Sequence, residues 1–415
     1  MRGIGFPLCS RRNLACFQAS EKERIRGSLE RQPCRRYQNG NIAGKPGDTR
    51  TTLRGEQVNP DGSVSGNLLQ RLAAGTLRLE QVGRTKPQAS RNREPTAGVC
   101  WIMLKQQVFR PRVGTIHQID KHQVHVLESG DLNARPIVVL HGCGSLAEEV
   151  LLPFAQSPFR MVAPDRPGYG FSSPLPLAER GPIGQSFWLE RLIDAMDLHC
   201  VSIVAHSIGS APALQLAARR PELVNGLLLI SPCCRPVPPK PLPILRASVA
   251  PVVGSLIRQH IISRWAAFFL ERGLRSSSFP NPLPPHLSVL PAAHMVNPGA
   301  IETMANELRA FNKDMELQPK LPGNLPLHVL FGSEDRIVQP AWHINGLRQK
   351  HPRPTLRVIE GVGHLPHHVV PAVARQMLSD LAREQAQQPS ERNLAGVAWA
   401  GSPTPRLNSR VGRIG

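Results

Sequence analysis

The clearest candidate for catalytic chemistry is a serine that stands between an apolar run and a helical pattern. Residues 201–205 predict a buried strand, and Ser207 follows them at the start of an Ala- and Leu-rich stretch. A serine at such a junction sits on a sharp, strained turn that exposes its hydroxyl, and the helix start behind it leaves a backbone N–H free. The turn needs small residues two positions to either side of the serine. The pattern Ala205-His206-Ser207-Ile208-Gly209 meets that need and predicts a nucleophile elbow with Ser207 as the nucleophile.

A histidine and a carboxylate that could activate this serine follow two later apolar runs. His364 stands between Gly363 and Leu365 after the run 355–359, where it could reach over the end of a sheet as general base. Asp335 follows the run 327–331, and a carboxylate there would orient the histidine and stabilise its imidazolium. Two alternatives stay open at this point. Glu334 competes for the same role, and Asp335 could instead cap the next helix.

The elements that must position these groups alternate between strand and helix. Continuous apolar runs, typical of strands buried on both faces, occupy residues 137–140, 160–163, 201–205, 226–230, 327–331 and 355–359. Helical patterns occupy residues 184–196, 208–220, 341–350 and 370–383. Two short alternating strands flank Asp120-Lys121. This order predicts an α/β fold with a doubly wound, mostly parallel sheet.

A long interval between two of the strands, residues 231–323, departs from this alternation. It contains Pro-rich stretches and two helical patterns, at 244–272 and 298–315. A structureless loop of that length is improbable in a compact domain, so we expect a mostly helical insertion that covers one edge of the sheet. Its apolar side chains are expected mostly to face the sheet, with some lining an acyl pocket: Trp265, Phe268, Phe269, Leu270, Phe279 and Met295. Arg258, Arg264 and Arg309 could bind an acidic substrate, although a solvated face is the preferred interpretation.

Taken together and in this order, the motifs resemble those of the α/β-hydrolase fold superfamily, over about residues 113–383. The order Ser207, Asp335, His364 is the order of that family's catalytic triad. The resemblance implies that two backbone N–H groups, those of Cys143 and Ile208, form an oxyanion hole. The loop that would carry the first donor reads Leu140-His141-Gly142-Cys143-Gly144-Ser145, where the glycines leave the backbone free to turn inward. The Cys143 side chain itself is interpreted as incidental.

Three further groups of polar residues have structural interpretations. Asp165 and Arg166 lie in a turn-rich loop that resembles a family hallmark, and we expect a charge pair to brace it. His206 is interpreted as structural or as lining the pocket. His367 and His368 could join His364 in a metal site only if acidic or Cys partners lay at similar depth. We therefore predict no metal and no organic cofactor, and interpret His367 and His368 as a helix start or a pocket wall.

The resemblance implies a serine hydrolase, of the carboxylesterase or lipase type, that cleaves an ester or related acyl bond through an acyl-enzyme. The insertion would act as a lid that selects substrate size. Alternatives on the same fold remain open: an acyltransferase, a cofactor-free haloperoxidase or perhydrolase, a carbon–carbon bond hydrolase, and a non-catalytic binding protein. The dehalogenases and epoxide hydrolases of this fold attack with Asp, so Ser207 argues against both.

The net charge of +20 over 415 residues would suit a nucleic-acid or membrane partner if it lay on the folded part. Residues 1–102, however, carry +10 of it and residues 103–383 only +8. The first segment lacks sustained periodicity, so we expect a disordered basic extension and consider Met103 as the natural start. We expect residues 103–383 to form the hydrolase domain and residues 384–415 a disordered tail. The expected partner is a small ester or acyl substrate, with no nucleic acid; the oligomeric state stays open.

Cysteine spacing and apolar runs give the expected compartment. Eight cysteines lie at irregular spacings without a CxxC pair, which favours free thiols in a reducing, cytoplasmic compartment. No apolar run reaches about 18 residues and no signal-peptide pattern opens the chain, so we expect no stable membrane insertion.

Overall fold

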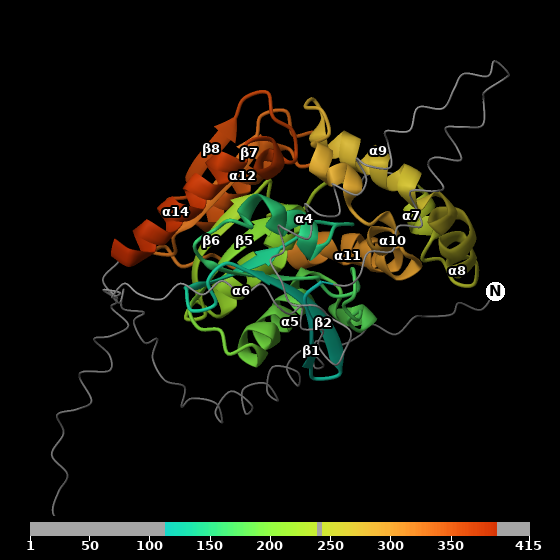
Figure 1. Ribbon diagram of the computed structural model, residues 1–415, viewed down its shortest axis with the longest axis horizontal. Coiled ribbons are helices and arrows are strands. Elements are labelled where there is room, and N and C mark those ends of the chain that lie inside the picture. The colour runs from blue at the N-terminus through green and yellow to red at the C-terminus, as the bar shows by residue number, and fades with distance from the viewer. Residues whose placement is uncertain (1–112, 239–242, 388–415) are drawn as a thin grey trace, which may run out of the picture. The chain divides into compact units, whose positions relative to one another are not determined.

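One eight-stranded sheet forms the centre of the computed structural model, which describes residues 113–238 and 243–387 (Figure 1). The strand order is β1-β2-β4-β3-β5-β6-β7-β8. Strands β3 to β8 pair in parallel, whereas β1 and β2 join the sheet by antiparallel pairing. Their bounds are β1 Thr115–Ile119, β2 His122–Ser129, β3 Pro136–Leu140, β4 Arg160–Pro164, β5 Val201–His206, β6 Val224–Ile230, β7 Leu327–Gly332 and β8 Thr355–Ile359. This arrangement confirms the predicted doubly wound, mostly parallel sheet.

The central strands are apolar on both sides because helices cover both faces of the sheet. Every residue of β3, β5 and β7 is buried. The run 355–359 differs from its prediction: β8 ends the sheet, and its residues are exposed or half-buried. Val358, for example, is 48% exposed. An apolar run by itself does not distinguish an edge strand from a central one.

Two helical layers enclose this sheet. On one face lie α5 (Pro182–Ala195), α6 (Ser210–Arg219) and α12 (Pro340–Lys350), whose apolar side chains share a core with β3, β5 and β7. On the other face lie α4 (Ala147–Leu151) and α14 (Pro371–Gln387), which share a second core with the same strands. Burial of each large side chain in these cores, such as Trp188 or Phe154, contributes roughly 1.5–3 kcal/mol. The four predicted helices are thus present.

The segment between β6 and β7 is largely helical, as predicted, but it is broken into short pieces. In chain order they are α7 (Pro243–Ala247), α8 (Val253–Leu256), the π-helical turn Ile257–Ile262, a 3₁₀ turn, α9 (Ala266–Ser278), a second 3₁₀ turn, α10 (Ala292–Met295) and α11 (Pro298–Glu316). The expected helix 244–272 is interrupted at Val252, whose φ of 65° lies in the left-handed region. Figure 1 shows α7 to α10 grouped to one side of the sheet, with α11 beside them.

The expectation that the apolar residues of this segment mostly face the sheet is wrong for three of them. Trp265, Phe268 and Phe279 are 43–44% exposed, whereas Met295 is buried. Phe268 stands on α9, which packs mainly against α10, whereas Trp265 precedes this helix and Phe279 follows it. Arg264 and Arg309 are exposed, as preferred, and Arg258 pairs with Glu302.

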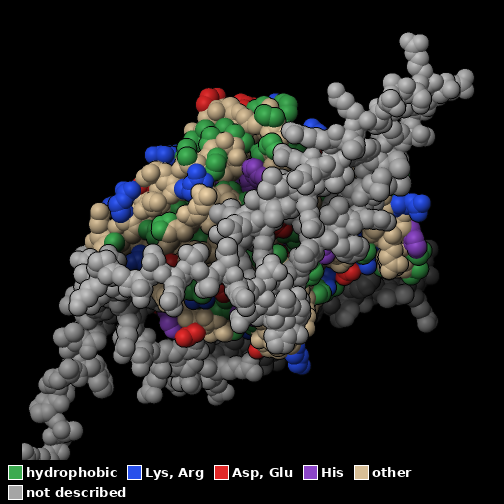
Figure 2. All heavy atoms as spheres, viewed as in Figure 1, with side chains coloured by type: hydrophobic (Ala, Val, Ile, Leu, Met, Phe, Trp, Pro, Cys, Tyr) green, Lys and Arg blue, Asp and Glu red, His purple; other side chains and the backbone are tan. Residues whose placement is uncertain are grey.

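The charge and cysteine expectations have mixed outcomes. On the face that Figure 2 shows, Lys and Arg side chains lie in small separate groups among apolar and uncharged atoms. None of the described helices combines the length and apolar character needed to cross a bilayer. Cys143, Cys233 and Cys234 are free thiols, but Cys200 is disulfide-bonded, which irregular spacing along a chain cannot exclude. The extension 1–102, the start at Met103 and the tail from residue 388 lie outside the described residues.

Candidate active site

The predicted nucleophile sits on a strained turn between β5 and α6. Ser207 opens a 3₁₀ turn, Ser207–Gly209, and its φ of 53° lies in the left-handed region that residues with a side chain rarely adopt. Such strain costs about 1–3 kcal/mol and persists only where the surroundings enforce it. A Cβ on Gly209 would meet the carbonyl oxygen of His141 at 2.5 Å, so only glycine fits at this position without a shift of the backbone. Ala205 is fully buried in the last part of β5.

The three predicted triad residues converge at the carboxyl ends of β5, β7 and β8. His364 Nε2 lies 3.0 Å from Ser207 Oγ, and His364 Nδ1 lies 2.7 Å from Asp335 Oδ2. All three side chains are buried. This chain of contacts allows one imidazole to accept the hydroxyl proton on one side while donating an N–H to a carboxylate on the other.

Asp335, and not its neighbour Glu334, is the carboxylate in contact with His364. Its second oxygen, Oδ1, accepts hydrogen bonds from the amides of Ile337 and Val338, at 2.9 and 2.8 Å. Burial by itself would raise the pKa of Asp335, but His364 and these amides lower it below its ordinary value. The group is therefore held as an anion against the imidazole.

The loop after β3 lies next to the serine with its backbone turned inward. Gly144 has a φ of 66°, and a Cβ on Gly142 would approach both His206 and Ser207 within 3.2 Å. In the described part of the chain, the amide of Cys143 has no hydrogen-bond partner. The N–H of Ile208, the second residue of its 3₁₀ turn, lies before the turn's internal hydrogen bonds begin. The loop with Gly142 and Cys143 thus lies against the turn that carries Ser207 and Ile208, and the oxyanion-hole role of the two amides stays a prediction.

Burial shifts the pKa of the thiol and of two imidazoles around this loop toward their uncharged forms. Burial raises the pKa of the Cys143 thiol to about 12, which agrees with an incidental side chain. Burial also lowers the pKa of His141 to about 4; its Nδ1 contacts the carbonyl of Gly142, and its Nε2 accepts from the amide of Arg166. The pKa of His206 is likewise lowered by burial, then by His367 and His364. Its Nε2 contacts the carbonyl oxygen of His364 at 3.2 Å.

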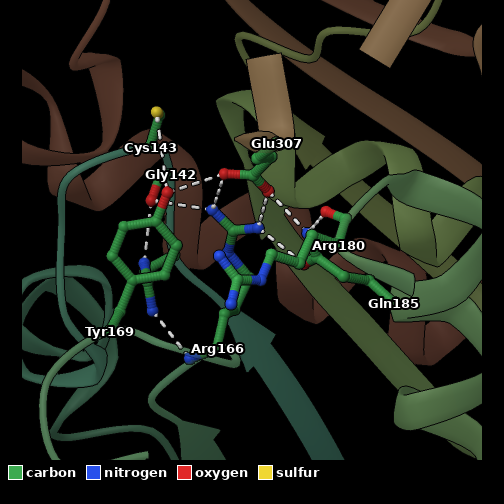
Figure 3. A network of polar contacts seen from close by, with 8 residues as sticks. Gly142, Cys143, Arg166, Tyr169, Arg180, Gln185 and Glu307 are labelled. Carbon is green, nitrogen blue, oxygen red and sulfur yellow. Dashed lines mark hydrogen bonds and ion pairs between the residues drawn. The ribbon is translucent and has the colours of Figure 1, made fainter. Parts of the chain in front are cut away.

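A buried network joins the oxyanion loop to α11 (Figure 3). The Arg166 guanidinium pairs with the Glu307 carboxylate, and Arg166 Nη2 donates to the Gly142 carbonyl oxygen at 3.1 Å. Tyr169 and Gln185 add hydrogen bonds to the same carboxylate, at 2.7 and 2.8 Å. Arg166 and Glu307 are both almost fully inaccessible to solvent. Charge pairs thus brace this loop, as expected, but Asp165 and Arg166 do not pair with each other: Asp165 pairs with His125 at 2.7 Å.

The loop that carries His364 is also tied to the segment between β6 and β7. The amide of His364 donates to the carbonyl oxygen of Ser277 at the end of α9. Asn281 accepts from the Gly363 amide and donates to the Gly361 carbonyl, at 3.1 and 3.0 Å. Parts of this segment therefore hold the site together in addition to covering it.

Sequence reasoning missed two buried carboxylates near the site, Glu307 and Glu149. Glu307 lies on the buried side of α11, at helical spacing from Thr303 and Phe311. A carboxylate on the buried face of a predicted helix was the feature of the sequence that could have identified it. Glu149 lies beside Glu148 in a short apolar helix, and nothing local indicates which of the two is buried. Glu149 Oε1 lies 2.7 Å from His368 Nε2 and 3.5 Å from His367 Nε2. These histidines therefore have a buried acidic partner, which could not be identified from the sequence.

Comparisons with known proteins agree with this architecture. Residues 137–376, more than half of the chain, match the model of the alpha/beta hydrolase family. An uncharacterised protein of Mycobacterium tuberculosis is 27% identical over 251 residues, which cover 57% of this chain and 72% of that protein. The AB hydrolase superfamily protein YfhM of Bacillus subtilis is 24% identical over 292 residues, 63% of this chain and 95% of YfhM.

Solved structures show the same fold at low sequence identity. The 2-hydroxy-6-oxo-6-phenylhexa-2,4-dienoate hydrolase of Rhodococcus sp. strain RHA1 superposes with a TM-score of 0.52 at 21% identity. The superposition covers 65% of this chain and 97% of that one. At this identity, the likeness concerns the fold alone.

Proposed function

The chain belongs to the alpha/beta hydrolase family, and from this premise we propose that it is a serine hydrolase acting on an ester or related acyl bond of a small or medium substrate. The observation that carries the proposal is the continuous line of contacts Ser207 Oγ–His364 Nε2 and His364 Nδ1–Asp335 Oδ2, at 3.0 and 2.7 Å. A strained, buried serine in contact with a base that is itself oriented by a carboxylate is the arrangement of an activated nucleophile.

The first half of the proposed reaction forms an acyl-enzyme. Ser207 Oγ attacks the carbonyl carbon while His364 Nε2 takes the hydroxyl proton. Asp335 stabilises the imidazolium that results. The carbonyl oxygen becomes negative and accepts hydrogen bonds from the amide N–H groups of Cys143 and Ile208. Each hydrogen bond stabilises the transition state by roughly 3 kcal/mol. The bond between the acyl carbon and the alcohol oxygen then breaks, His364 gives that oxygen the proton it took from Ser207, and the acyl group stays on Ser207.

In the second half, water takes the place of the alcohol. His364 accepts a proton from the water while the water oxygen attacks the acyl carbon. The same two amides donate hydrogen bonds to the oxyanion that forms. Collapse of this intermediate breaks the bond to Ser207 Oγ, which regains its proton from His364. The products are the acid and the free enzyme. These steps require no metal or organic cofactor.

Substrate access is the part of the proposal that involves a lid. Ser207 is only 7% exposed, so a substrate needs a covering element to move. We propose that the segment between β6 and β7 acts as this lid and selects substrate size. Large apolar side chains of this stretch, such as Val252 and Leu256, are 87% and 54% exposed.

The proposal is tested by labelling with a fluorophosphonate and by turnover of p-nitrophenyl esters of graded acyl length. The wild type should label and hydrolyse at least one ester, Ser207→Ala should do neither, and Ser288→Ala, at an exposed serine, should behave as wild type. Labelling that survives Ser207→Ala would disprove the nucleophile. A folded wild type that neither labels nor turns over any ester would disprove the catalytic assignment. The acyl-length series reports the size of the acyl pocket.

A further inference from the structure

Next to the triad lies a second cluster of titratable side chains that the proposed chemistry does not use. It consists of Glu149 on α4 and of His367 and His368 on α13 (Pro366–Val369). All three are buried, and one ligand atom of each lies within 4.8 Å of the others. The ring of His206 packs between this cluster and the triad, with centroids 4.5 Å from His367 and 4.9 Å from His364.

The carboxylate of Glu149 is placed between two kinds of partner. Its Oε1 faces both imidazoles, at 2.7 Å from His368 Nε2 and 3.5 Å from His367 Nε2. Its Oε2 accepts a hydrogen bond from Ser145 Oγ at 2.7 Å. One oxygen is therefore fixed by a hydroxyl, and the other is shared by two ring nitrogens.

His367 is the unusual member of the cluster. It is fully buried, yet within the described residues its Nδ1 has no hydrogen-bond partner, and its Nε2 has only the long 3.5 Å contact with Glu149 Oε1. Buried polar atoms are nearly always hydrogen-bonded, and an orphan calls for an explanation such as a bound ion.

We propose that Glu149, His367 and His368 bind one divalent transition-metal ion, for which Zn²⁺ is the best match. Two imidazole nitrogens and one carboxylate oxygen form a ligand set typical of zinc, with a fourth position left to water. Tetrahedral bonds of about 2.0–2.1 Å place ligand atoms about 3.4 Å apart. The contact of Glu149 with His367 already has this spacing, and the contact with His368 must widen slightly.

Two further features support a metal at this position. His286 Nε2 lies 2.9 Å from His368 Nδ1. If Nδ1 carries the proton and donates it there, Nε2 is left with a free lone pair toward Glu149, as expected for a metal ligand held by an outer partner. A cavity of about 180 Å³ is lined by His286, His367, His368 and Arg375 among others, and it offers the ion a path and its water a place.

The ion would link two segments that support the active site. Helix α4 follows the oxyanion loop, and α13 follows His364 directly in the chain. Metal bonds from both segments would hold the two ends of the site in register, in place of the present contact between Glu149 Oε1 and His368 Nε2. This inference does not depend on the reaction that Ser207 performs.

The experiment titrates the chelator-treated full chain with Co²⁺ and follows visible absorption. One equivalent should give the intense bands of a four-coordinate site, Zn²⁺ should abolish them by displacement, and X-ray absorption of the Zn²⁺ form should show imidazole scatterers at roughly 2.0 Å. A spectrum of hexahydrated Co²⁺ only, or a zinc shell of water oxygens only, would overturn the proposal. Both readouts use the wild type and so do not depend on a variant that folds.

Variants then locate the ion. His367→Gln and Glu149→Gln should abolish the stoichiometric cobalt bands, and His286→Gln should weaken binding by roughly 10- to 100-fold through the lost outer partner. His199→Gln, at an exposed histidine far along the chain from the cluster, should leave the titration unchanged. Cobalt bands that survive His367→Gln in a variant with wild-type circular dichroism would also overturn the assignment.

Discussion

The guanidinium of Arg166 and the carboxylate of Glu307 form a buried ion pair between positions 141 residues apart in the chain. Because Arg166 also donates to the carbonyl oxygen of Gly142, the pair connects α11 to the loop that carries the Cys143 amide. The segment between β6 and β7 is therefore part of the support of the site. The Glu307 carboxylate accepts further hydrogen bonds from Tyr169 and Gln185, so few of its lone pairs remain without a donor.

The first prediction concerns the energy of this pair. Removal of one partner leaves the other charge buried alone, so Glu307→Ala should lower the free energy of unfolding by about 3–5 kcal/mol. The double variant Arg166→Met with Glu307→Leu should be destabilised by much less than the sum of the single changes, since no lone charge remains. Urea unfolding of the wild type, Arg166→Met, Glu307→Leu and the double variant measures this coupling. If the two single changes lowered the free energy of unfolding additively in the double variant, the ion pair would not be energetically coupled.

The second prediction is the pH dependence of the same pair. Burial alone would raise the pKa of Glu307, but Arg166 and the hydrogen bonds lower it below its ordinary value. A carboxyl with a lower pKa in the folded state stabilises the fold above its unfolded-state pKa, and this contribution is lost as the pH falls toward the folded-state pKa. The difference in unfolding free energy between wild type and Glu307→Gln should be constant from about pH 6 to 8 and shrink below about pH 4.3. A difference that grows on acidification would contradict the lowered pKa.

The third prediction separates the two adjacent carboxylates. In Asp335→Asn the amide oxygen can still accept from Ile337 and Val338, but an N–H then faces His364 Nδ1. The imidazole is pushed into the tautomer that carries its proton on Nε2 and cannot accept from Ser207, so kcat should fall by roughly 10⁴-fold. Glu334→Gln is the matched control and should leave kcat unchanged. An equal loss of kcat in Asp335→Asn and Glu334→Gln would contradict the assignment of Asp335 as the triad carboxylate.

The triad could be predicted from sequence because each member follows an apolar run, and the carboxyl ends of parallel strands meet at one edge of the sheet. Gly142, Cys143 and Gly144 also follow a strand, but their predicted role came from the resemblance to the α/β-hydrolase fold superfamily. Glu307 and Glu149 could not be assigned in this way, because a helix position reveals a buried face only after its packing partner is known. The outward face of α9 has the same cause: apolar spacing does not say which neighbour a helix packs against.

The fourth prediction tests the close approach at the nucleophile turn. In Gly209→Ala the new Cβ would lie 2.5 Å from the carbonyl oxygen of His141, so the oxyanion loop must shift away from Ser207. A displacement near 1 Å can cost about 10²-fold in rate, and kcat/KM for the best ester should fall by about that factor. Gly273→Ala is the control: its Cβ would meet nothing within 4 Å, and helix α9 should gain up to about 1 kcal/mol. Unchanged kcat/KM in Gly209→Ala would contradict the geometry of the turn.

The last prediction concerns how much of the chain the chemistry needs. Every contact described for the triad, the oxyanion loop and the Arg166–Glu307 pair joins residues between 113 and 387. The two buried cores of the sheet lie within the same limits. We therefore predict that a chain of residues 103–387, assayed beside the full chain under reducing conditions that break the Cys200 disulfide in both, folds with a cooperative urea transition and retains the kcat/KM of the full chain toward p-nitrophenyl esters. Ser207→Ala in the shortened chain supplies the background rate. A shortened chain that keeps its circular dichroism but loses activity would show that residues outside these limits contribute to the site.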